Sequence, residues 1–226
     1  MTTVPTTPQE LAAIEFAENP DERCACMLVL DTSGSMSGEP VQSLNRGLQR
    51  FQDELRKDPL ARRRVEVALV TFGQSVRVMQ TFSTADRMEL PVLEASGMTP
   101  MADAVLTALT LLEQRKSEYK AFGIQYYRPW LFLITDGDAT DDEALQQQAQ
   151  AKLREAEHHK RVAPFLVGVN GANLQKLSQW SARPPVKLDG VKFEEMFCWL
   201  SDSQKRVAAS QPGDQVALPK PNWGTV

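Results

Sequence analysis

The sequence predicts an α/β fold: a doubly wound, mostly parallel central sheet with one antiparallel edge strand and helices on both faces. Short apolar runs alternate along the chain with longer segments of helical periodicity, which is the order typical of such a sheet. The run over residues 128–135 is almost wholly apolar in its second half, so it indicates a central strand buried on both faces.

The first half of the chain predicts three strands and one helix. Met27–Leu30 is a short buried strand after a polar lead, and Pro40–Phe51 repeats apolar residues at the spacing of an amphipathic helix. Val65–Phe72 is the second predicted strand. After a Gly-Gln turn signal, residues 76–82 alternate apolar and polar side chains, which predicts a hairpin whose second strand is the antiparallel edge.

The second half predicts further alternation of helices and strands. A helix is expected over Pro100–Arg115, since proline suits the first helical turn. The remaining elements are expected as a strand over 128–135, a glutamine-rich helix over 143–160, a strand over 162–169, and short helices near 173–180 and 193–201.

Length and composition indicate a single folded domain. The chain has 226 residues, 42% of them hydrophobic, which is enough for one substantial core. We divide it into an N-terminal lead over residues 1–22, the domain over 23–205, and a C-terminal tail over 206–226 that contains Pro and Gly. The tail is expected to pack loosely or to extend.

Charge and hydropathy argue against nucleic-acid and membrane partners. The net charge is -4 and the pI is near 5.4, whereas phosphate binding needs clustered Lys and Arg. The basic run Arg62–Arg64 is expected to be a solvated loop. Residues 1–20 lack the features of a secretory signal, and no stretch approaches the roughly 18 apolar residues of a membrane span. We therefore expect a cytoplasmic protein.

The cysteines favour the same compartment. Cys24 and Cys26 are separated by one residue, which is too close for the usual zinc spacing, and Cys198 lies far away. We expect small buried thiols in a reducing environment.

Oxygen-bearing side chains gather at three predicted element boundaries. Asp31, Ser33 and Ser35 follow the first strand, with a glycine between the serines that allows a sharp turn. Thr99 directly precedes a helix, and Asp136 follows the strand over 128–135. Because ligands bind at the carboxyl ends of strands in an open α/β sheet, these loops are predicted to meet at a site for a hard cation.

These motifs resemble the metal-ion-dependent adhesion site of von Willebrand factor A (VWA) domains, in both order and spacing. The shared motifs are the D-x-S-x-S loop, the later threonine of Gly-Met-Thr-Pro and the aspartate of Thr-Asp-Gly. The fuller stretches over 31–40, 67–72 and 133–137 are most similar to the bacterial tellurium-resistance TerY-like branch. The resemblance runs from about residue 24 to about residue 219 and implies the Rossmann-like VWA fold.

The resemblance also implies a set of metal ligands. Ser33, Ser35 and Thr99 would supply hydroxyls, while Asp31 and Asp136 would contribute directly or through waters. The ion in such a site is usually magnesium, with manganese as the alternative, and an Asp or Glu of a protein partner fills its vacant position. Magnesium suits this role because it prefers octahedral oxygen ligands and keeps waters that a carboxylate can displace.

The predicted function is a metal-dependent protein–protein interaction module without enzymatic activity. The TerY-like resemblance implies an adaptor in a tellurium-resistance, stress-response or phage-defence system. It suggests kinase-like or phosphatase-like proteins of the same system as partners.

Three alternatives compete with this interpretation. Asp31 could act as the nucleophile of a metal-dependent phosphatase or as a phosphoacceptor, but the haloacid-dehalogenase-like enzymes that this arrangement resembles use a second Asp two residues later, where this chain has Ser33. Thr99 could serve only as the N-cap of its helix. A Ser-His-Asp hydrolase has little support, because His158 and His159 lie in a polar helical segment and are expected to be exposed.

Three further features stay open from sequence. The aromatic residues between 119 and 130 could anchor an interface or cover the core. Met36, Met98 and Met101 flank the metal loops and could seat a partner or belong to the core. Asp138 is an additional acid beside the motif, with an undecided effect on the ion.

Overall fold

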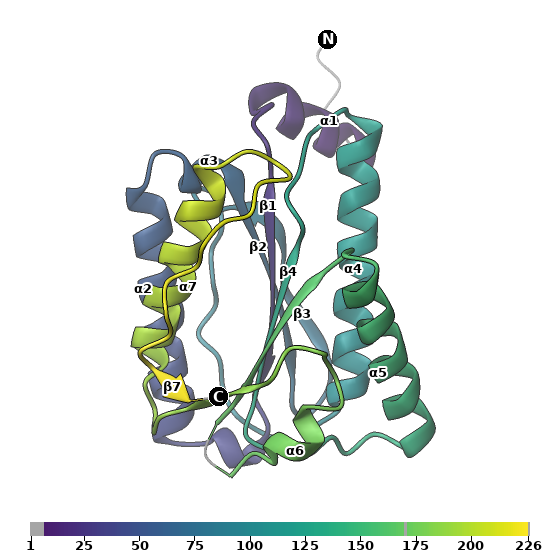
Figure 1. Ribbon diagram of the computed structural model, residues 1–226, viewed down its shortest axis with the longest axis vertical. Coiled ribbons are helices and arrows are strands. Elements are labelled where there is room, and N and C mark those ends of the chain that lie inside the picture. Colours follow the sequence, from purple (N-terminus) through teal and green to yellow (C-terminus); the bar gives the residue numbers. More distant parts are fainter. Residues whose placement is uncertain (1–6, 170, 226) are drawn as a thin grey trace.

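The centre of the molecule is a mostly parallel sheet, as the sequence predicts. The computed structural model describes residues 7–169 and 171–225, and among these residues it contains a seven-stranded sheet with the order β3-β2-β1-β4-β5-β6-β7 (Figure 1). The strands are β1 (Cys24–Asp31), β2 (Val65–Phe72), β3 (Arg77–Thr84), β4 (Trp130–Thr135), β5 (Ala163–Gly168), β6 (Val186–Leu188) and β7 (Gly224–Thr225).

The helices are α1 (Pro8–Glu18), α2 (Glu39–Lys57), α3 (Ala61–Arg64), α4 (Met101–Ala121), α5 (Glu143–His158), α6 (Leu174–Leu177) and α7 (Phe193–Ala208). Five helices lie close to predicted positions, whereas α1, in the predicted N-terminal lead, and α3, in the predicted basic loop, were not predicted. A single 3-10 turn over Gly34–Met36 follows β1.

Strand directions confirm the predicted edge strand and add a second one. β1 runs parallel to β2 and β4, and the parallel pairing continues through β5 to β6. β3 pairs antiparallel with β2 at one edge, as the hairpin pattern predicts. At the other edge β7 pairs antiparallel with β6, a pairing that the sequence does not predict because each strand contributes only two residues to it.

Helices cover both faces of the sheet. Figure 1 shows α2 and α7 on one side and α4 and α5 on the other. Leu28 and Leu30 of β1 belong to the apolar cluster on the side of α2 and α7. Met27 and Val29 belong to the apolar cluster on the side of α4 and α5. Every residue of β1 is buried, which explains why its apolar run is continuous rather than alternating.

The topology creates a switch point beside β1. The chain leaves β1 through α2 to reach β2 on one side, while β4 lies on the other side of β1. The carboxyl ends of β1 and β4 therefore flank the crevice in which open α/β sheets bind ligands.

The C-terminal segment differs from its prediction. Helix α7 continues through Ala208, beyond the predicted domain boundary at residue 205. Trp223 is only 2% exposed, its ring lies 5.6 Å from that of Trp199, and Trp199 Nε1 donates to the carbonyl of Pro219 at 2.8 Å. The expectation of loose packing is therefore wrong, because a large aromatic side chain anchors the tail against α7.

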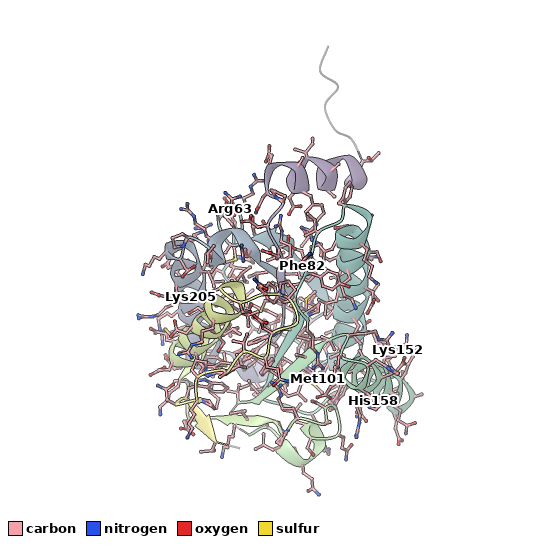
Figure 2. All side chains as sticks on the ribbon, turned by 45° about the horizontal axis from the view of Figure 1, so that its top comes forward. Arg63, Phe82, Met101, Lys152, His158 and Lys205 are labelled. Atoms are coloured by element: carbon pink, nitrogen blue, oxygen red, sulfur yellow. The ribbon has the colours of Figure 1, made fainter. Side chains whose placement is uncertain are left out.

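The basic run also differs from its prediction. Arg62–Arg64 belong to the one-turn helix α3 rather than to a loop, since the Asp58 carboxylate accepts the N–H of Ala61 at 2.8 Å and starts the turn. The side chains of Arg62 and Arg63 are nevertheless exposed, as predicted for a solvated charge run. His158 is exposed as well, and Figure 2 shows it with Lys152 on the outer side of α5.

Several side chains left open by the sequence belong to the core. Tyr119, Tyr127 and Trp130 are buried, so most of the aromatic cluster covers the core. Cys24 and Cys26 are buried free thiols, as expected. In the part of the chain that is described, no helix combines the length and the apolar character that crossing a bilayer requires.

Candidate metal centre

The five predicted ligands lie at one end of the sheet. Asp31 is the last residue of β1, and Asp136 directly follows β4. β1 and β4 are hydrogen-bonded neighbours, so their ends lie at the same edge. Ser33 and Ser35 lie in the turn after β1, and Thr99 lies just before α4.

A chain of hydrogen bonds joins the β1 loop to the β4 loop. The hydroxyl oxygens of Ser33 and Ser35 are 3.0 Å apart. The Ser35 hydroxyl donates to Oδ1 of Asp136 at 2.8 Å. Two of the three predicted loops therefore place their oxygens in direct contact.

Asp31 is the most buried of the five side chains. Its Oδ1 accepts the N–H of Ser33 at 2.8 Å, and its Oδ2 accepts the hydroxyl of Thr135 at 2.6 Å. Burial raises the pKa of Asp31, against the opposing hydrogen bonds from Ser33 and Thr135. Burial also raises the pKa of Asp136, and the hydrogen bond from Ser35 opposes it.

Thr99 presents its hydroxyl to the β4 loop. A Cβ placed on Gly137 would lie 3.6 Å from Oγ1 of Thr99, so the two loops touch where this glycine lacks a side chain. Main-chain bonds hold the threonine in place: its N–H donates to Oγ1 of Thr140 at 3.0 Å, and its carbonyl accepts the N–H of Thr140 at 2.9 Å. Within the described residues the Thr99 hydroxyl itself makes no hydrogen bond and is available to a ligand.

Another residue caps the helix that Thr99 precedes. The Asp141 carboxylate accepts the N–H of Ala102 at 2.9 Å and the N–H of Asp103 at 3.2 Å. An acidic group at this position also interacts favourably with the positive end of the helix dipole. Asp141 thus takes the capping role that was the alternative for Thr99.

Backbone contacts fix the Thr99 loop against the serine loop. The N–H of Gly34 donates to the carbonyl of Gly97 at 3.0 Å, and the N–H of Ser96 donates to the carbonyl of Thr32 at 2.7 Å. Gly97 has a φ of 83°, and a Cβ there would lie 2.4 Å from backbone atoms of Gln74. Only glycine fits this position, so the Thr99 loop can pack closely against the turn between β2 and β3.

The donor set fits a hard divalent cation. It combines two carboxylates with three hydroxyls, which are ligands for magnesium or manganese rather than for zinc. The described residues contain no group of three or more His, Cys, Asp or Glu side chains arranged to hold a metal. The charges that perturb Asp31 and Asp136 include no Lys, Arg or His, so a bound cation would compensate two carboxylates that the described chain leaves unpaired.

Sequence reasoning overlooked two supporting residues. Thr135 orients Asp31 through its hydroxyl, and Asp141 caps the helix behind Thr99. A polar residue that ends an apolar strand, directly before a predicted ligand, was the available signal for Thr135. Asp141 gave no such signal, because its partners lie about forty positions earlier in the chain.

The flanking methionines divide between core and surface. Met36 and Met101 are buried, and Met98 is 66% exposed. Of the three, only Met98 can contact a partner without rearrangement of the core.

Comparison with known proteins identifies relatives of the whole domain. A family model described as von Willebrand factor type A domain matches residues 26–203, which is most of the chain. Inter-alpha-trypsin inhibitor heavy chain H4 of Sus scrofa is 30% identical over 138 residues, covering 58% of this chain and 14% of the heavy chain.

Solved structures share the fold at low sequence identity. A von Willebrand factor type A protein from Catenulispora acidiphila superposes with a TM-score of 0.61 at 15% identity, over 82% of this chain and 43% of the other. The manganese-loaded TRAP protein of Plasmodium vivax superposes with a TM-score of 0.51 at 17% identity, over 78% and 73% of the two chains. This chain thus spans less than half of the inhibitor heavy chain and of the Catenulispora protein.

Proposed function

This chain belongs to the von Willebrand factor type A domain family, and we propose that it is a metal-dependent protein–protein interaction module. The main support is the meeting of Asp31, Ser33, Ser35, Thr99 and Asp136 at the switch point of the sheet. Their oxygens come from three loops that main-chain hydrogen bonds and a glycine contact hold against one another.

The proposed ion is magnesium, with manganese as the alternative. Ser33, Ser35 and Thr99 would hold it through hydroxyls, and Asp31 and Asp136 would hold it directly or through waters. The ion would supply a positive charge with a position open to an external oxygen ligand. The manganese-loaded state of the Plasmodium vivax TRAP protein gives this choice of ion a parallel in the same fold.

The proposed partner is a protein that offers an Asp or Glu side chain. Among the five proposed ligands two carry a carboxylate, Asp31 and Asp136, so the ion would keep affinity for a further one. Ser35 is exposed and Asp136 is partly exposed, which gives a partner access to this side of the site.

A binding role explains Asp31 better than a catalytic role. Both of its carboxylate oxygens accept hydrogen bonds from the chain, and the residue is 0% exposed. A nucleophile for phosphate transfer needs an oxygen that the substrate can reach, and this carboxylate is covered by the chain. We therefore propose that the protein has no phosphatase activity of its own.

At the level of the cell, we propose a cytoplasmic adaptor in a TerY-like tellurium-resistance, stress-response or phage-defence system. The motif stretches over 31–40, 67–72 and 133–137 support this branch, and the buried thiols of Cys24 and Cys26 suit a reducing compartment. Kinase-like or phosphatase-like proteins of the same system are the proposed partners.

A pull-down from native lysate tests the proposed site. The wild type is compared with the double variant Asp31→Ala/Ser33→Ala, each with magnesium and with a chelator. A partner retained only by the wild type in magnesium is the expected result. The control is Asp53→Ala/Ser117→Ala, which removes the same residue types from exposed helical positions and should retain the partner. Capture by the Asp31/Ser33 variant would remove these loops from the mechanism.

A phosphatase assay tests the absence of catalysis. With p-nitrophenyl phosphate and magnesium, the wild type and Asp31→Asn should show the same background. Activity that disappears in Asp31→Asn would favour the enzyme alternative.

A further inference from the structure

An ion pair lies directly beside the candidate metal loops. Asp138 follows Asp136 by two residues, and its Oδ2 is 2.6 Å from Nζ of Lys176 on α6. The Lys176 side chain is 61% exposed and that of Asp138 is 46% exposed, so solvent reaches both. Figure 1 shows α6 at the end of the sheet where β1 and β4 terminate.

The backbone around Lys176 is fixed. Asn173 caps α6 by accepting the N–H of Lys176 at 3.1 Å. Hydrogen bonds between Thr135 and Gly137, both at 3.2 Å, hold the chain just before Asp138. Both partners of the ion pair therefore extend from a hydrogen-bonded backbone.

The ion pair lines a cavity that borders the metal loops. A cavity of about 540 Å³ is lined by Asp138 and Lys176 together with Thr135 and Gly137. Thr135 is the residue that holds Asp31, and Gly137 is the residue against which the Thr99 hydroxyl lies. The wall of this cavity therefore includes two residues that contact proposed ligands, although it includes none of the five ligands themselves.

Charge balance gives the ion pair a role at the site. A divalent cation would be neutralised by Asp31 and Asp136, which leaves no net repulsion toward a partner's carboxylate. An unpaired Asp138 would add one negative charge within about 7 Å of Asp136 along the chain, and that charge would both strengthen cation binding and repel an incoming acid. Lys176 cancels this charge.

We propose that Lys176 holds Asp138 away from the bound cation and so keeps the ion able to accept a carboxylate from a partner. This inference rests on the proposed function of the metal loops and adds a positioning residue to them. Asp138 is then an internal competitor of the partner's acid, restrained by a single ion pair.

Loss of the Lys176 charge should change the affinity for Mn²⁺ and the affinity for a carboxylate in opposite directions. In Lys176→Gln the freed Asp138 should tighten Mn²⁺ binding and weaken carboxylate binding, each by about three- to tenfold, as expected for one half-exposed charge acting over several ångströms. In Asp138→Asn both changes should reverse. The double variant Asp138→Asn/Lys176→Gln should return close to the wild type, because the net charge beside the ion is restored.

The experiment uses the full chain and two probes. Mn²⁺ affinity is measured from the electron paramagnetic resonance signal of free ion, and carboxylate binding from the loss of water relaxation by bound Mn²⁺ when a short peptide with one central Glu is added. Lys57→Gln is the matched control, since it breaks another exposed ion pair, with Glu54 at 2.9 Å on α2, and should leave both readings unchanged.

Each outcome decides the proposal. Changes of opposite sign in Lys176→Gln, cancelled in the double variant, support it. A double variant that still binds the peptide poorly would show that Lys176 contacts the acid directly and would overturn it. Variants indistinguishable from Lys57→Gln would overturn it while leaving the metal site intact, whereas a wild type that binds no Mn²⁺ would overturn the proposed function as well.

Discussion

A buried carboxylate lies at each end of the sheet, and the groups that donate hydrogen bonds to it differ in charge between the two ends. At the amino end, Glu66 of β2 is fully buried and accepts hydrogen bonds from Arg23 at 2.8 Å and from Arg115 at 2.8 and 2.7 Å. The Tyr119 hydroxyl completes this set of donors. At the carboxyl end, Asp31 of β1 is equally buried, but its donors among the described residues are the neutral groups of Ser33 and Thr135.

The pKa directions at the two ends reflect this difference. Burial alone would lower the pKa of Arg115, but hydrogen bonds to Glu66 and its charge raise it, so this guanidinium stays charged. Burial raises the pKa of Asp31, and no cation among the described residues counteracts it. The amino end therefore carries a structural charge pair, whereas the carboxyl end leaves its carboxylates for a positive charge from outside the chain.

The largest expected effect comes from a substitution at the amino end of the sheet. Glu66→Gln keeps the volume of the side chain but removes the carboxylate that pairs with the buried Arg23 guanidinium, while Arg115 keeps Glu15 and Glu118 as partners. The free energy of unfolding should fall by about 3–5 kcal/mol, the cost of removing one partner of a buried ion pair. Urea denaturation measures this change.

A surface ion pair supplies the control for Glu66. Glu18 pairs with Arg87 at 2.7 Å, and both side chains are 54% exposed. Glu18→Gln should change the free energy of unfolding by no more than about 1 kcal/mol. Equal losses in the two variants would mean that burial of Glu66 has no special weight, and the contrast between the two ends would fail.

The next effect concerns the carboxyl end and depends on metal. Magnesium at about one hundred times its dissociation constant should raise the free energy of unfolding of the wild type by about 2.7 kcal/mol. Asp31→Asn should lose this increment. In chelator it should be as stable as the wild type to within about 1 kcal/mol, since the amide can still accept from Ser33 and the uncompensated buried charge is gone. Thermal or urea unfolding with and without magnesium gives all four values.

The stability of Asp31→Asn in chelator distinguishes two roles for Asp31. A variant that is strongly destabilised in chelator would show that Asp31 supports the fold in the way that Glu66 does. Both buried carboxylates would then stabilise the fold, and they would differ only in the groups that donate hydrogen bonds to them.

Sequence patterns predicted the elements well where the signal is local. Residues 65–72 are a strand with the predicted bounds, and the five ligand candidates lie at the predicted element boundaries. The D-x-S-x-S motif occupies one loop, so its geometry follows from a few neighbouring residues. The continuous apolar run also predicted the burial of both faces in β4.

Features that depend on distant residues could not be read in this way. Glu66 appears in sequence as a charged residue inside an apolar strand, and its partners Arg23 and Arg115 lie 43 and 49 positions away. The same holds for Lys176, which lies 38 positions from Asp138, and for Trp223, which the Pro- and Gly-containing composition of the tail conceals. Pairings between distant residues appear only once the strand order is known.

The smallest expected effect separates two threonines within the metal loops. The Thr135 hydroxyl donates to the Asp31 carboxylate, whereas the Thr99 hydroxyl has no hydrogen-bond partner among the described residues. In chelator, Thr135→Val should lower the free energy of unfolding by about 1.5 kcal/mol or more, because a buried carboxylate loses a donor. Thr99→Val should change it by less than about 0.5 kcal/mol, since valine replaces a hydroxyl that supports nothing in the fold.

Thr99→Val should have a much larger effect on magnesium binding than on the stability of the metal-free fold. If its hydroxyl is a ligand, Thr99→Val should weaken magnesium binding by about tenfold or more, as measured by isothermal titration calorimetry, while Thr99→Ser keeps the hydroxyl and most of the affinity. A residue that contributes little to the free energy of unfolding without metal but much to ion affinity is what we expect at a binding site. Equal magnesium affinity in the wild type and Thr99→Val would instead make Thr99 a bystander and reduce the proposed ligands to the β1 and β4 loops.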